Sequence, residues 1–111
     1  MTYQDVAEMI EQIGVPYAYY QFPEGTEQAC PFICFFYAQD NDFLADNKNY
    51  QKIAELHIEL YTDARDFDLE QTVERVLEEY ELVYSWEESF IDSEKMHLTT
   101  YTTEVLINAY D

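Results

Sequence analysis

Apolar and polar residues alternate over ten positions from Ile53 to Thr62. A period of two is typical of a strand that buries one face and wets the other. We therefore predict a central strand over about residues 50–62, around which the rest of the chain is arranged. Its buried face holds Ala54, Leu56, Ile58 and Leu60, and its wet face holds Glu55, His57, Glu59 and Tyr61.

Two further segments have the apolar spacing of amphipathic helices. Residues 2–13 form the first, with Thr2 and Asp5 placed for a capping box and Gly14 placed to end the helix. Asp66 is a suitable N-cap for the second, predicted over about residues 67–80. The apolar stripe of this second helix is Leu69, Val73, Val76, Leu77 and Tyr80, and its water-facing acids are Glu70, Glu74, Glu78 and Glu79.

Four more segments are predicted as strands. They are Tyr17–Phe22, Phe32–Ala38, residues 82–91 with a bulge at Glu87 and Glu88, and Met96 to about Asn108. The resulting order is α-β-β-β-α-β-β within one domain of 111 residues. Hairpin links favour a mainly antiparallel five-stranded sheet with both helices packed on one face, an α+β two-layer sandwich.

The strand Phe32–Ala38 is apolar throughout, so both of its faces need cover. One face can meet the helices, and the other needs a second layer or another subunit. The side chains that this singles out as interaction candidates are Phe32, Phe35 and Phe36. In the polar loop that follows, Phe43 and Leu44 either plug into the fold or contact a neighbour. The single Trp86 is either a core residue or a contact hot spot.

Charge narrows the range of partners. The chain has 24 acidic and 5 basic residues and a net charge of −19. Phosphate contacts need Lys and Arg, so direct adhesion to nucleic acid or to an anionic membrane is disfavoured. No signal peptide is recognised and no apolar run approaches the length of a membrane span. Two cysteines, Cys30 and Cys34, are expected to be packed free thiols in a reducing cytosol.

Motifs for catalysis are missing from the sequence. There is no Gly-rich phosphate loop and no nucleophile elbow, and the spacing of the two cysteines is not that of a zinc site. Glu55, His57 and Glu59 share one strand face and could hold a metal, but a wet face with cross-strand partners is the favoured interpretation. We therefore expect no catalytic residues, no cofactor and no metal.

Several segments together resemble the small tail-completion and tail-terminator proteins of long-tailed bacteriophages. The resemblance covers most of the chain. It rests on Pro31–Ile33, Ala45–Tyr50, Ile58–Thr62, Asp66–Leu77, Ile91, Glu94, Met96 and Tyr101.

This resemblance implies a non-enzymatic ring, commonly a hexamer, that caps the tail tube and joins the tail to the head of the virion. It would assemble in the bacterial cytoplasm, and its partners would be other copies, the tail-tube protein and a head–tail connector protein. DNA passes through such a ring, so acids in its lumen would repel phosphate. Candidates for the lumen are Glu55 and Glu59, or Glu70 and Glu74. Subunit contacts would come from the apolar strand and the loop, including Asp46 and Asn47.

Two other functions compete with this one. An acidic inhibitor that mimics DNA would need carboxylates along one elongated face, whereas here they are scattered over helices, turns and strands. A small enzyme is disfavoured by the missing motifs.

Overall fold

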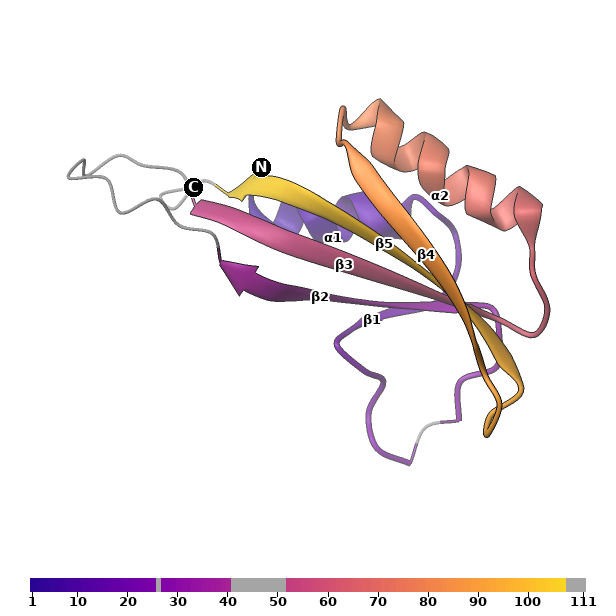
Figure 1. Ribbon diagram of the computed structural model, residues 1–111. Coiled ribbons are helices and arrows are strands. Elements are labelled where there is room, and N and C mark those ends of the chain that lie inside the picture. Colours follow the sequence, from indigo (N-terminus) through magenta and orange to yellow (C-terminus); the bar gives the residue numbers. More distant parts are fainter. Residues whose placement is uncertain (26, 41–51, 108–111) are drawn as a thin grey trace.

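The computed structural model describes residues 1–25, 27–40 and 52–107. The predicted α+β class and the order α-β-β-β-α-β-β are confirmed (Figure 1). The elements are α1 (Tyr3–Glu11), β1 (Tyr17–Tyr19), β2 (Phe32–Asp40), β3 (Lys52–Thr62), α2 (Phe67–Glu79), β4 (Tyr84–Ile91) and β5 (Met96–Ile107). Neither described helix is long and apolar enough to cross a membrane.

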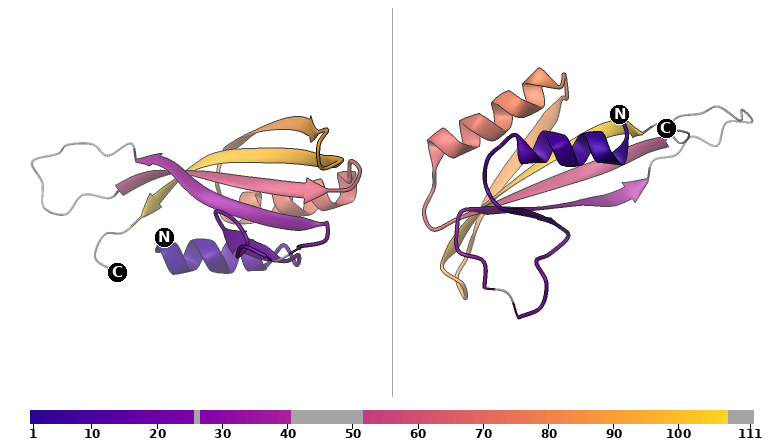
Figure 2. Two further views of the ribbon diagram at one scale, coloured as in Figure 1. Left: turned by 90° about the horizontal axis from the view of Figure 1, so that it is seen from below. Right: turned by 180° about the vertical axis from the view of Figure 1, so that it is seen from behind.

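The strands form one sheet in the order β1-β2-β3-β5-β4. β1 pairs with β2 in parallel, and the other three pairs are antiparallel. The sheet is therefore mixed but mainly antiparallel, as predicted. Both helices lie on the same side of the sheet, while the β1–β2 connection and the β4–β5 turn extend to the opposite side (Figures 1 and 2).

The core fills the space between the sheet and the helices. The alternation in β3 has the predicted direction, with its apolar face buried and its polar face partly exposed. Apolar faces of both helices and of β5 complete the same cluster. Its fully buried members include Val6, Met9, Ile10, Ala54, Leu56, Ile58, Val73, Leu77, Tyr101 and Val105.

Local signals at the helix ends have the predicted geometry. Thr2 Oγ1 accepts a hydrogen bond from the Asp5 backbone N–H at 3.0 Å, and Asp5 Oδ2 accepts one from the Thr2 backbone N–H at 2.9 Å. Gly14 has φ of +92°, the left-handed conformation that glycine adopts without strain. Asp66 Oδ1 caps α2 by accepting from the Leu69 backbone N–H at 3.0 Å.

The predicted bulge at Glu87 and Glu88 is wrong. β4 pairs with β5 one residue to one from Tyr84 to Ile91. β4 is an edge strand whose two faces are both largely exposed, so consecutive glutamates need no bulge to stay out of the core. β1 is also shorter than predicted, because Tyr20 adopts φ of +69° and turns the chain away.

Some predictions fall on parts of the chain that the structure does not describe. Phe43, Leu44, Asp46 and Asn47 all lie between residues 41 and 51. Their assignment as a plug or as subunit contacts stays a prediction.

Candidate functional site

Both described helices lie on one face of the sheet, and we call the opposite face the open face (Figure 2). It consists of the strand residues that alternate with the core residues, as the strand register shows. The open face is formed by Ala18, Phe32, Cys34, Phe36, Ile53, Glu55, His57, Glu59, Tyr61, Ser85, Glu87, Ser89, Ile91, Met96, Leu98, Thr100, Thr102, Glu104 and Leu106.

Aromatic rings cover the β2 side of the open face. Phe32 stacks on Tyr61 with 4.7 Å between ring centroids, and Phe36 stacks on His57 at 5.1 Å. The segment that follows β1 covers part of these rings, because Tyr20 packs edge-on against Phe36 with 5.8 Å between ring centroids. The second apolar face of β2 is therefore partly covered from within the chain.

Phe35 does not belong to this open surface. It points to the helix side, is buried, and lies opposite Ile58 in the register. The prediction that groups it with Phe32 and Phe36 as an interaction residue is wrong, because alternation along β2 places it in the core.

The polar residues of the open face on β3 pair with one another. Glu55 Oε2 lies 3.0 Å from His57 Nε2, and Tyr61 donates from its hydroxyl to Glu59 Oε1 at 3.0 Å. Among the residues that the structure describes, no group of three or more His, Cys, Asp or Glu side chains is placed to hold a metal ion. The arrangement is that of a wet sheet face.

The open face is negative. Its four carboxylates are those of Glu55, Glu59, Glu87 and Glu104, and none of the open-face residues named above is a lysine or an arginine. Glu55 and Glu104 stand directly opposite each other in the β3–β5 register. Like charges in opposite positions repel each other, which makes this pair a local cost to the sheet.

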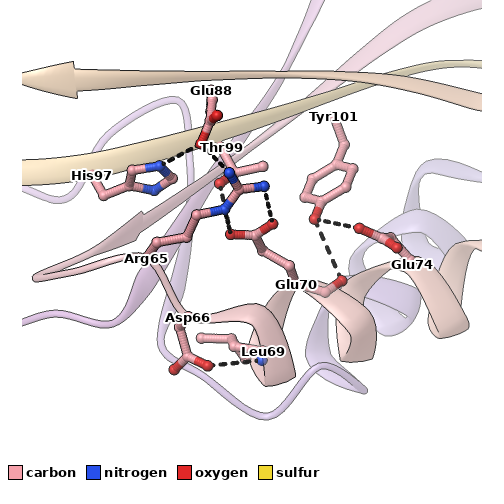
Figure 3. Close-up of polar contacts among 9 residues, drawn as sticks. All are labelled: Arg65, Asp66, Leu69, Glu70, Glu74, Glu88, His97, Thr99 and Tyr101. Atoms are coloured by element: carbon pink, nitrogen blue, oxygen red, sulfur yellow. Dashed lines mark hydrogen bonds and ion pairs between the residues drawn. The ribbon is translucent and has the colours of Figure 1, made fainter.

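A second polar feature, the Arg65 cluster, fastens the start of α2 to the sheet (Figure 3). Arg65 Nε and Nη2 donate to the two carboxylate oxygens of Glu70 at 3.3 Å each, and Nη1 lies 2.6 Å from Glu88 Oε2. His97 Nε2 lies 3.1 Å from the same Glu88 oxygen. Thr99 donates to Glu70 Oε2 at 3.4 Å. The cluster thus joins the loop before α2, α2 itself, β4 and β5.

Two aromatic rings flank the guanidinium of this cluster. Arg65 Cζ lies 4.6 Å from the ring centroid of Phe67 and 5.5 Å from that of Trp86. Trp86 is 49% exposed, so the alternative that makes it a core residue is wrong. Cation–π contacts hold the tryptophan against Arg65 at the β4 edge.

The prediction that Glu70 faces water is wrong. The residue is only 5% exposed and turns toward the sheet, where Arg65 and Thr99 bind its carboxylate. Glu74 is half-buried and accepts a hydrogen bond from the Tyr101 hydroxyl at 3.1 Å. His97, which the sequence leaves without a role, belongs to the Arg65 cluster, and no signal along the chain pointed to that pairing.

Alkaline pH should destabilise the fold through three phenols, that of the buried Tyr101 and those of the partly buried Tyr37 and Tyr61. Burial, followed by the nearby carboxylates of Glu74 and Glu70, raises the pKa of Tyr101 above the usual value of 10.0. Burial is also the main cause that raises the pKa of Tyr37 and of Tyr61. A raised pKa in the folded state means that this contribution to stability is complete below pH 10 and is lost progressively above it.

We therefore expect a late step in the phenolate absorbance, coincident with the loss of circular dichroism. Tyr101→Phe should remove one tyrosine from that step. Ionisation of every tyrosine near pH 10, in a protein that stays folded, would contradict the burial of these phenols.

No protein-family model matches this sequence, and no curated protein matches it. The fold is similar to that of a chain in the solved structure of a virion of a native gene transfer agent (GTA) particle. The likeness has a TM-score of 0.60 and covers 93% of this chain and 86% of that chain, at 13% sequence identity. At this identity the likeness establishes a shared fold.

Proposed function

We propose that this chain is a structural protein of a phage-like virion, of the tail-terminator or tail-completion type. It forms a ring, commonly a hexamer in such proteins, at the head-proximal end of the tail tube and joins the tail to the head. The observation that carries the proposal is the likeness of nearly the whole fold to a chain of a GTA virion. Its partners are other copies, the tail-tube protein and a head–tail connector protein.

A ring needs two different surfaces on each copy, because its contacts are head-to-tail. The two edges of this sheet differ in that way. The β4 edge exposes Trp86 and Phe90, and the β1 edge exposes Tyr17 and Tyr19. Exposed aromatic side chains are frequent anchors in protein interfaces, which supports these edges as the contact surfaces.

The open face suits a passage for DNA. It holds Glu55 and Glu59 among its four carboxylates, and the open-face residues named above include no lysine or arginine. DNA phosphates would be repelled from such a wall, so DNA could pass without adhering. Glu70 is not part of this wall, because its carboxylate is held by Arg65 under α2.

The alternative of a DNA-mimicking inhibitor has less support. Carboxylates lie on the open face and also on the outer surface of α2, where Glu78 and Glu79 are exposed. Acids on opposite sides of the molecule do not copy one phosphate track.

Cosedimentation with tail tubes tests the proposal. We expect the protein to pellet with tubes of its cognate tail-tube protein and to saturate at a few copies per tube, as binding at one end requires. Trp86→Lys should reduce this binding, whereas Gln71→Lys, the same added charge on the exposed surface of α2, should not. Retention of duplex DNA on a filter should be negligible at physiological salt.

Coating along the whole tube would contradict a terminal ring. So would a protein that remains monomeric and stays in the supernatant with tubes present, or one that retains duplex DNA at sub-micromolar concentration.

A further inference from the structure

We propose that a groove at one end of the open face binds an extended segment of a partner protein in which an arginine or lysine lies between apolar side chains. The groove has a volume of about 750 Å³. It lies between the chain that follows β1 and the β4–β5 turn, the two segments that extend away from the helices in Figure 1. Its volume is within the range of about 300–1,000 Å³ that is usual for ligand sites.

The groove is lined with aromatic and apolar side chains. Phe32 and Tyr61, stacked at 4.7 Å, come from neighbouring strands of the sheet. Tyr20 and Phe22 belong to the segment after β1, and Met96 belongs to the start of β5. Aromatic ring faces attract cations, and the apolar side chains accommodate the alkyl stem of a long basic side chain and its apolar neighbours.

Carboxylates lie on both sides of these rings. Glu27 comes from the segment after β1 and Glu94 from the β4–β5 turn, and both line the groove and are exposed. Behind Tyr61, Glu59 accepts the hydrogen bond of its hydroxyl at 3.0 Å. Among the residues that the structure describes, none of those lining the groove is a lysine or an arginine, and Lys95 of the same turn is not one of them.

The combination of rings and acids specifies the ligand. An anionic segment would be repelled by Glu27 and Glu94, and a purely apolar segment would gain no charge contact from these two exposed carboxylates. A cation flanked by apolar side chains matches both features of the groove. The net charge of −19 also favours the approach of basic partners over acidic ones.

The proposal rests on the groove of a single copy and does not require a ring. The test therefore uses the monomer. Loss of peptide binding would not count against the ring, and failure to form a ring would not count against the groove. The probe is the blocked peptide Gly-Leu-Arg-Leu-Gly, titrated into labelled protein at physiological salt and followed by amide chemical shifts. The comparison peptide has glutamate in place of arginine.

We expect amide chemical shift changes only in the segment after β1, in the β4–β5 turn and in the strand residues that line the groove between them. The glutamate peptide should cause no such changes. The double variant Glu27→Gln with Glu94→Gln should weaken binding by at least about fivefold, as loss of two charge contacts to a guanidinium implies. Tyr20→Ser, at an exposed ring that contacts Phe36, should weaken it by about threefold through loss of a cation–π contact.

The matched control is Glu78→Gln with Glu79→Gln, which removes the same charge from the exposed surface of α2. It should change the affinity by less than about twofold, because screening weakens charges beyond roughly 8 Å. Equal weakening by the two double variants would overturn the proposal, and so would shifts spread along α2. Equal binding of the glutamate peptide, or no binding of the arginine peptide, would overturn it as well.

Discussion

Replacing Arg65 by alanine is expected to lower the melting temperature by roughly 10 °C, a large effect for a residue at the surface. The substitution leaves the Glu70 carboxylate, with its side chain only 6% exposed, without its charge partner. A buried charge that loses its partner costs far more than an exposed ion pair contributes. Thermal unfolding followed by circular dichroism measures the shift.

Arg75→Ala is the matched control for this prediction. Arg75 pairs with Glu79 across one turn of α2, and the two side chains are 67% and 58% exposed. Its loss should change the melting temperature by less than about 3 °C, since exposed pairs contribute little. Adding Glu70→Gln to Arg65→Ala should recover part of the loss, because a neutral amide costs less to bury. Equal shifts for the two arginine variants would show that Glu70 does not depend on Arg65.

The second large effect is expected in the core. Ile58 is fully buried on β3, with Phe35 opposite it on β2 and Tyr101 opposite it on β5. Ile58→Ala should lower the free energy of unfolding by about 2–5 kcal/mol, through lost burial and the cavity that remains. Urea unfolding measures this change, which is a large fraction of the roughly 5–15 kcal/mol that stabilises a typical domain.

Thr102→Ala tests the opposite face of the same sheet. Thr102 lies on the open face, opposite His57, and is partly exposed. Its substitution should change the free energy of unfolding by less than about 0.5 kcal/mol. Comparable losses at Ile58 and Thr102 would mean that the two sheet faces are buried alike, contrary to the structure.

Local patterns were sufficient to predict most of the fold. Alternation along residues 53–62 identified both the strand and its buried face, because the period of a strand is fixed by its backbone. Capping residues predicted the starts of both helices for a similar reason, since Thr2 and Asp66 bind backbone groups only three residues away. These signals lie within a few residues of one another and so are visible in a sequence.

Contacts between distant segments were not predictable in this way. Glu70 was assigned to water because it is charged and lies beside the apolar stripe of α2, yet Arg65 and Thr99 bind its carboxylate. Glu88 and His97 complete the cluster from β4 and β5, and nothing along the chain indicates their pairing. The bulge prediction failed because an edge strand exposed on both faces lacks the alternation that would reveal a regular strand.

The function we propose for this protein is to join the head and the tail of a phage-like virion. Electron microscopy of particles produced with and without a functional copy of its gene tests this most directly. We expect that particles made without the protein consist of separate heads and tails. Supplying the protein in trans should restore joined particles with a ring at the head-proximal end of the tail. Complete, joined particles in its absence would rule out this joining role.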